Sequence, residues 1–250
     1  MQVKRKTINE CKGQPRLQKA LAFALLLKFR LGRSSMMRDY SINKIHTLTK
    51  VSATTIRKYL PIIIEKGWVT FCGKNSQHLV VAKICSSTNN RNVCVDKFCF
   101  NSFQDVYRSL RAFIALIIQS HKDFIKRTIQ IASHPKKGQN FKAARKLLKR
   151  LVKQGVLKSV YDAYKEYGLS LQRIAKETGN CVRTAQRIMQ YAINKNWAKK
   201  THNYEKVKSA NFYCDGYTFY KNGYLYKVNA NTYELSKNVT ADISHGNNSW

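Results

Sequence analysis

Apolar residues at helical spacing mark the stretch from Ser41 to Trp68 as two helices joined by a tight turn. They recur every three or four positions: Ile42, Ile45 and Leu48, then Ile56, Tyr59, Leu60, Ile63 and Ile64. Val51 and Ser52 separate the two sets, and the hydroxyl of Ser52 suits the N-cap of the second helix. Gly67 suits the position after a helix C-terminus.

The same pattern occurs a second time when the sequence is shifted by 129 positions without a gap, from Ser170 to Trp197. Identical residues meet along the two copies: Ser41 and Ser170, Ile45 and Ile174, Thr49 and Thr178, Thr55 and Thr184, Ile64 and Ile193, Lys66 and Lys195, Trp68 and Trp197. An internal repeat of this kind predicts that one structural unit is built twice.

Each copy resembles the helix-turn-helix family, and the strand-like runs after the first copy make it similar to a winged-helix domain. The resemblance implies that the second helix of each pair reads the DNA major groove. Its outward residues are the candidates for base contacts: Thr54, Thr55, Arg57 and Lys58 in the first copy, and Arg183, Thr184, Gln186 and Arg187 in the second. Arginine suits guanine, glutamine suits adenine, and threonine offers a hydroxyl and a methyl group.

The remaining pattern predicts a mainly α fold with small β wings, an α+β class of two winged-helix domains joined by a long helix. The expected divisions are a loose basic arm (1–14), winged-helix domain one (15–92), a strand and long linker helix (93–140), winged-helix domain two with a tyrosine-rich hairpin (141–236), and a disordered tail (237–250). Further helices are expected at 17–31, 141–154 and 156–167, and strands at 68–73, 78–84 and 93–100.

The helix expected over 102–133 is more apolar than a helix crossing solvent requires. Ser102 and Asp105 form a capping-box-like start, and apolar residues then follow at helical spacing. This surface can be used in core packing, or in pairing with the same helix of a second subunit to form a homodimer.

Charge indicates the partner. The chain of 250 residues has 46 Lys and Arg against 13 Asp and Glu, a formal net charge of +33. Such an excess repels itself unless a polyanion neutralises it, so nucleic acid is the expected partner. The resemblance to the helix-turn-helix family implies that this nucleic acid is double-stranded DNA. A membrane is not expected, because the longest apolar run, Leu21 to Leu27, is far too short to span one and no signal-peptide core is visible. The expected location is the cytoplasm, on the nucleoid.

Several polar residues near the predicted helix pairs are candidates for phosphate or wing contacts. They are Arg33, Arg38, Lys74, Gln77, Lys149, Lys199, Lys200 and His202. We expect Lys199, Lys200 and His202 at the tip of the second wing. For Lys74 and Gln77, a plain solvated turn is an equal alternative.

The cysteine pattern does not indicate a metal or a cofactor. There are seven cysteines, none in a C-x-x-C pair or at zinc spacing with two histidines, so we expect reduced thiols.

Aromatic residues gather near the C-terminus: Phe212, Tyr213, Tyr217, Phe219, Tyr220, Tyr224 and Tyr226. Asn222 and Gly223 between them predict a hairpin with a type I′ turn. The rings could stack on unpaired bases, but aromatic residues are also ordinary strand formers with one face buried.

Three functions fit these features, and an enzyme is not expected because the acidic residues are scattered and no glycine-rich phosphate loop is present. A carboxylate triad assembled in space, as in a transposase, stays an alternative. The first function is a sequence-specific transcription regulator of a phage or mobile element. The second is a replication initiator that also meets the replication machinery, since the two-domain layout is similar to plasmid initiators. The third is a non-specific DNA-packing or virion-associated protein.

Overall fold

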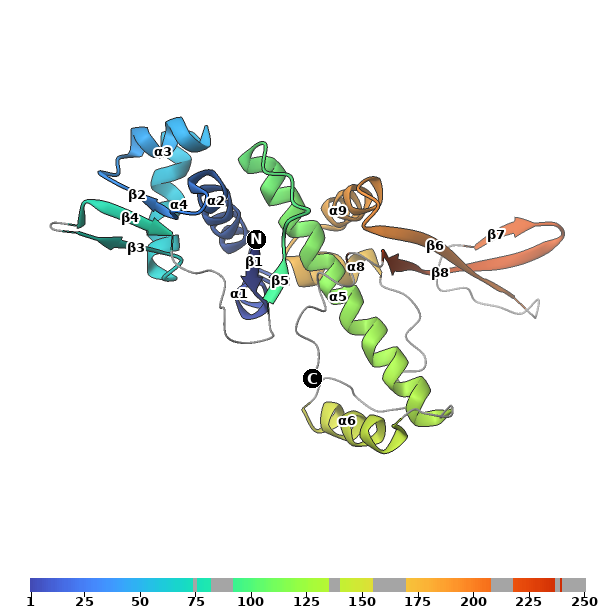
Figure 1. Ribbon diagram of the computed structural model, residues 1–250. Helices are drawn as coiled ribbons and strands as arrows, with labels where there is room; N and C mark the ends of the chain where they lie inside the picture. Colours follow the sequence, from blue (N-terminus) through green and yellow to red (C-terminus); the bar gives the residue numbers. More distant parts are fainter. Residues whose placement is uncertain are drawn as a thin grey trace.

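The computed structural model describes residues 1–73, 76–81, 92–134, 140–154, 170–207, 218–236 and 239. Over these residues the chain is mainly helical with small antiparallel sheets, which confirms the predicted α+β class (Figure 1). The predicted helix at 156–167, the predicted tail at 237–250 apart from Val239, and Lys74 lie outside the described residues.

The first part of the chain contains four helices and four short strands in the described residues. Its elements are β1 (Gln2–Lys4), α1 (Arg5–Glu10), α2 (Pro15–Leu31), β2 (Met36–Met37), α3 (Ile42–Thr49), α4 (Ala53–Glu65), β3 (Val69–Cys72) and β4 (His78–Val81). In the sheet formed here, β4 lies between β2 and β3. The strand β2 is not among the predicted strands, because two residues are too few to show an alternating pattern.

The second part begins with a strand that returns to the N-terminus and then consists of helices followed by a sheet. Its elements are β5 (Asn92–Cys94), α5 (Phe103–Ser133), α6 (Phe141–Lys153), α8 (Leu171–Thr178), α9 (Val182–Asn194), β6 (Ala198–Lys206), β7 (Thr218–Lys221) and β8 (Tyr224–Leu235). The strand expected over 93–100 ends at Cys94 and is followed by a turn. In the second three-stranded sheet, β8 lies between β6 and β7.

The N-terminal segment forms β1 and α1 and buries apolar residues, so the prediction of a loose basic arm over 1–14 is wrong. Strand β1 pairs with β5, with Val3 opposite Val93. Val3, Ile8 and Cys11 have no exposed surface, and burial raises the pKa of the Cys11 thiol to about 12. These single apolar residues stand among many polar ones, which hides them from a search for amphipathic spacing.

The internal repeat is present in the structure down to single hydrogen bonds. Helices α3 and α4, the first helix pair, have the same bounds as α8 and α9, the second helix pair, after a shift of 129 positions. Ser41 and Ser170 each cap their helix by accepting a backbone N–H at 3.1 Å. Trp68 and Trp197 each donate a backbone N–H at 2.9 Å to the residue five positions before them.

A buried threonine has the same role in both helix pairs. The hydroxyl of Thr49 donates to the carbonyl oxygen of Ile45 at 2.7 Å, and that of Thr178 donates to the carbonyl oxygen of Ile174 at 2.6 Å. Both side chains are buried. A hydroxyl that bonds to its own helix can be buried at low cost, which explains a polar residue at this position in both copies.

Two apolar helices join the helix pairs into one core. Helix α2 packs against α3, α4 and α5, and α5 packs against α2, α8 and α9 (Figure 1). Residues 20–27 of α2 and 112–118 of α5 are buried all round, as expected for a helix with neighbours on several sides. This confirms core packing as a use of the apolar helix.

The last part of α5 packs against α6 in a small separate cluster. Its buried members are Ile129, Ala132, Ala144, Leu148 and Leu151. In Figure 1, α6 lies at the far end of α5, away from α2 and α9. The segment 141–154, which we expected within the second winged-helix domain, packs against the last part of α5.

Candidate nucleic-acid interface

Helix α4 presents an exposed polar face opposite its buried face. Ile56, Tyr59, Leu60 and Ile63 are buried in the core. Thr54, Arg57 and Lys58 are exposed, as the helical spacing predicts. The backbone of this helix is anchored by its apolar side, so the three exposed side chains are free to meet a ligand.

Helix α9 presents the corresponding face in the second copy. Ala185, Ile188, Met189 and Ala192 are buried, and Arg183, Gln186 and Arg187 are exposed. The exposed positions match those of α4 after the shift of 129 positions, but the residues differ. The two faces therefore offer the same geometry with different hydrogen-bonding groups.

The two remaining candidates for base contacts, Thr55 and Thr184, are only half-buried and take part in capping. The amide of Thr55 donates to the hydroxyl of Ser52 at 3.3 Å, and that hydroxyl donates to the Thr55 hydroxyl at 2.9 Å. The Thr184 hydroxyl lies 3.3 Å from the thiol of Cys181. Each threonine thus organises the first turn of its helix.

Cys181 is a residue at this surface that the sequence analysis did not single out. It is exposed at the N-cap of α9, where Ser52 stands in α4. The hydrogen bond from the Thr184 side chain and bonds from nearby backbone amides lower the pKa of the thiol. Aligning the two copies of the repeat places Cys181 opposite the capping residue Ser52. This difference between the copies could have identified Cys181 from the sequence.

The first sheet brings two of the predicted phosphate contacts together. The amide of Tyr40 donates to the carbonyl oxygen of Gln77 at 3.0 Å, so Arg38 and Gln77 lie at the same end of β2 and β4. Both side chains are exposed. Arg33, also exposed, lies at the other end of β2, where the amide of Val81 donates to the carbonyl oxygen of Ser35.

Three other candidates for phosphate contacts lie in the second sheet, at positions that differ from the prediction. Lys199, Lys200 and His202 are exposed but lie within the strand β6, with Lys199 opposite Glu234 and Lys200 opposite Tyr233. The prediction that they occupy the tip of a wing is wrong, because β6 continues to Lys206. They flank the base of a long sheet.

The predicted hairpin between β7 and β8 is confirmed. Asn222 and Gly223 have φ angles of 50° and 75°, as a type I′ turn requires. Lys221 and Tyr224 pair across the turn. Phe212, Tyr213 and Tyr217 lie outside the described residues.

A further basic surface lies on α6. Its exposed cations are Lys142, Arg145, Lys146, Lys149, Arg150 and Lys153. Because Leu148 and Leu151 face α5, most of these charges lie on the outer side of α6. Arg145 is the exception, since its Nε donates to the carbonyl oxygen of Ala132 in α5 at 3.4 Å. Lys149, one of the predicted phosphate contacts, belongs to this group.

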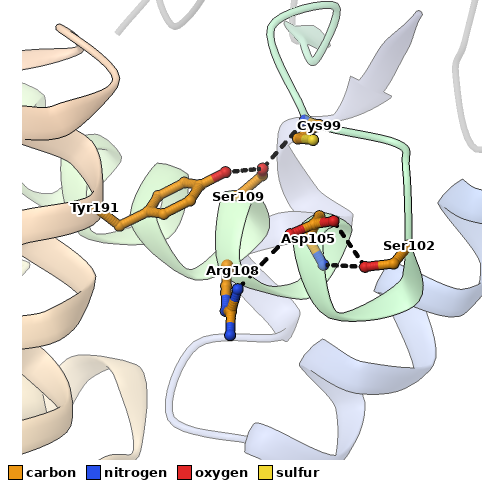
Figure 2. A network of polar contacts seen from close by, with 6 residues as sticks. All are labelled: Cys99, Ser102, Asp105, Arg108, Ser109 and Tyr191. Carbon is orange, nitrogen blue, oxygen red and sulfur yellow. Dashed lines mark hydrogen bonds and ion pairs between the residues drawn. The ribbon is translucent and has the colours of Figure 1, made fainter.

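A polar network fixes α9 against α5 (Figure 2). The hydroxyl oxygens of Ser109 and Tyr191 lie 2.9 Å apart, and the Ser109 hydroxyl also accepts the amide of Cys99 at 3.2 Å. Ser109 has no exposed surface. The bond between Ser109 and Tyr191 therefore links α9 to α5, and removing the Tyr191 hydroxyl would take one partner from a buried polar group.

The second helix pair is also bound directly to the N-terminal part of the chain. The amide of Gly13 donates to the carbonyl oxygen of Glu177 at 2.8 Å. Gly179, with φ +67°, lies so close that a Cβ atom there would be 2.5 Å from the carbonyl oxygen of Gly13. Gln18 of α2 is buried at this contact and donates to the carbonyl oxygen of Thr178 in α8. These contacts fix the position of the second helix pair relative to the N-terminal part of the chain.

The described residues contain no cluster of three or more His, Cys, Asp or Glu that could hold a metal ion. None of the helices in the described part is long and apolar enough to cross a bilayer.

Comparison of the chain with models of protein families, with curated proteins and with solved structures finds no match.

Proposed function

We propose that this protein binds double-stranded DNA sequence-specifically, using α4 and α9 as two recognition helices. The observation that carries the proposal is the structural repeat, in which two helix pairs with the same bounds expose a polar face at the same positions. One basic surface could belong to any protein with a charge of +33. Two matched faces on rigid helices are better explained by a ligand with a repeating groove.

The strands around the helix pairs support a winged-helix arrangement. In the first unit, β2 lies between α2 and α3 in the sequence and joins the hairpin of β3 and β4. In the second unit, α5 packs on α8 and α9 as α2 packs on α3 and α4, and the sheet of β6 and β8 follows α9. We therefore propose two winged-helix units that share one core.

In the proposed complex, phosphate contacts and base contacts have separate roles. Arg57 and Lys58 of α4, and Arg183, Gln186 and Arg187 of α9, would meet base edges in two major-groove segments. Arg38, Gln77, Lys199 and Lys200 would contact the backbone beside them, and Lys149 would do so from α6. Such contacts set affinity and register, whereas the recognition helices select sequence.

The fixed relation of the two helix pairs restricts the target site. Two recognition helices in adjacent major grooves have centres roughly one helical turn (~34–36 Å) apart. Because the two exposed faces differ in sequence, the two half-sites should differ as well. We propose an asymmetric site, or an imperfect direct repeat, with constant spacing.

Selection of bound duplexes from a random pool, at low and high salt, tests the proposal. Enrichment of a motif with two unlike halves at fixed spacing, retained at higher salt, is the expected result. Recovery of unselected sequences, with affinity collapsing as salt rises, would contradict it and indicate charge-driven packing of DNA.

Transcription regulation in a phage or mobile element is the function we place first, because site-specific binding is sufficient for it. A replication initiator is the second candidate. One observation favours it, namely the exposed aromatic residues of the second sheet, because an initiator also handles opened DNA. An enzymatic activity is not part of the proposal.

A further inference from the structure

The sheet formed by β6, β8 and β7 extends away from the helices as a long ribbon (Figure 1). Its strands carry the aromatic residues that the sequence analysis left with two interpretations. Which interpretation holds depends on whether the rings share a face and whether that face is covered.

Strand register places the rings on one face. Phe219 pairs with Tyr226, Tyr226 also pairs with Lys206, and Lys221 pairs with Tyr224. Paired residues of antiparallel strands point to the same side of the sheet, and alternate residues of one strand do so too. We call the resulting surface the aromatic face, with members His202, Tyr204, Lys206, Phe219, Lys221, Tyr224, Tyr226 and Val228.

Ring geometry agrees with the register. Tyr204 and Phe219 have centroids 5.0 Å apart in an edge-on contact, although β8 lies between their strands. Phe219 and Tyr226 stack at 5.5 Å, and His202 stacks on Tyr204 at 6.0 Å. The rings thus form a continuous row across the sheet.

This row is not buried by the described part of the protein. Tyr204 is 51% exposed and Tyr224 is 50% exposed, while Phe219 and Tyr226 are half-buried against each other. Strand residues that merely close a hydrophobic core would be buried on this side. Half-exposed, preordered rings instead offer flat surfaces for stacking.

The charge on the same face suits an anionic ligand. The Lys206 ammonium lies 3.0 Å from the centroid of the Tyr224 ring, and Lys206 and Lys221 are both exposed. Among its described positions the aromatic face holds aromatic, aliphatic and lysine residues and no carboxylate. Stacking rings beside lysines are the combination that binds unpaired bases through their π faces and phosphates through their charge.

We propose that the aromatic face binds single-stranded nucleic acid, with bases stacked on Tyr204 and Tyr224 and the backbone held by Lys206 and Lys221. This site is separate from α4 and α9 and does not depend on the proposed duplex binding. It adds a second ligand class to the protein. A chain that recognises a duplex site and holds an unpaired strand has the two activities needed where DNA is opened.

The test measures binding of the full chain to a labelled oligothymidylate and to an abasic strand of the same length and charge. Tyr204→Ala and Tyr224→Ala should each weaken binding of the oligothymidylate by at least about fivefold, which is the lower range for one stacked base. Binding of the abasic strand should not change. Tyr204→Trp should retain oligothymidylate binding.

Tyr220→Ala is the matched control. Tyr220 is 78% exposed in β7, but it pairs with Leu225 and so lies on the opposite side of the sheet. This substitution removes an equally large ring from the same strands, and it should leave oligothymidylate binding unchanged. An unchanged circular dichroism spectrum and an unchanged urea unfolding midpoint would show that the Tyr204→Ala variant is folded.

Three results would overturn the proposal. Equal affinity for the oligothymidylate and the abasic strand would show that charge alone binds. Equal loss in the Tyr204→Ala and Tyr220→Ala variants would remove the assignment to one face. A dimer that dissociates on Tyr204→Ala, with strand affinity unchanged, would assign the face to a second copy. Each result leaves duplex selection by α4 and α9 unaffected, so the two proposals fail separately.

Discussion

Gln18 in α2 donates a hydrogen bond from its side-chain amide to the backbone carbonyl of Thr178 in α8 at 3.0 Å, across 160 positions of the sequence. The same amide donates to the carbonyl oxygen of Cys11 at 3.0 Å. Gln18 is completely buried. One side chain therefore connects the N-terminal segment, the first unit and the last turn of α8.

Replacing Gln18 with leucine should destabilise the protein by about 1–2 kcal/mol. The substitution removes one hydrogen bond to each of two carbonyl groups and leaves each with one other donor. The Asn180 side chain still donates to the Thr178 carbonyl at 2.7 Å, and the Gln14 amide still donates to the Cys11 carbonyl at 3.2 Å. The loss is further offset because the Gln18 Oε1 atom is itself buried without a partner. Urea unfolding monitored by circular dichroism measures the change. Gln14→Leu, at an exposed position one turn earlier, is the control and should be close to neutral. Equal stability of both variants would contradict the role of Gln18.

Gly179→Ala should destabilise the protein more than Gly67→Ala. Both glycines have a positive φ angle, and each stands just after a helix, Gly179 after α8 and Gly67 after α4. Gly67 has open space around it, so alanine there adds only the cost of a left-handed backbone, about 1 kcal/mol. At position 179 the new methyl group would also clash with the Gly13 carbonyl, for a total of about 2–4 kcal/mol. Thermal unfolding of the two variants side by side measures the difference. Equal effects would show that the contact with Gly13 yields easily.

Cys181 should react with iodoacetamide at a lower pH than an ordinary exposed thiol. The thiolate is the reacting form, and the lowered pKa means that it is populated from a lower pH upward. Mass spectrometry of the labelled peptide across a pH series measures the rate. Thr184→Val removes the main hydrogen bond to the sulfur and should shift the rate profile to higher pH. An unchanged profile in that variant would assign the effect elsewhere.

Arg57→Ala and Arg187→Ala should relax sequence preference at separate positions of the DNA site, each by ~1–3 kcal/mol. Lys149→Ala should instead weaken binding to all sequences alike and reduce its salt dependence, since α6 presents charge without a recognition face. Competition binding with selected and random duplexes separates the two effects. Similar losses on both kinds of duplex for all three variants would refute the assignment of reading helices.

Much of the fold could be predicted because its elements have local signals. The apolar spacing and caps of the helix pairs gave their bounds, and Asn222 with Gly223 gave the last hairpin. The N-terminal strand and helix were missed because Val3 and Ile8 are isolated apolar residues, and because the strand partner of Val3 is Val93. Such pairing has no local signal.

The packing of the two units against each other could not be predicted from the sequence for a similar reason. A helix that is apolar all round, like α2 or the first half of α5, predicts burial but does not identify its neighbours. One difference between the two copies does indicate a contact between the units. Lys50 and Gly179 occupy equivalent positions with φ angles of 57° and 67°, and only the second is crowded by Gly13.

The back-to-back packing of α2 and α5 means that the chain cannot be divided into two working halves. A fragment ending near residue 100 would keep α3 and α4 but uncover the side of α2 that α5 normally covers. The complementary fragment would uncover α5 in the same way, so each half would aggregate rather than fold. Insertions and labels are therefore best placed in exposed turns such as Asn222–Gly223, whereas the N-terminal ammonium is engaged in an ion pair with Asp96.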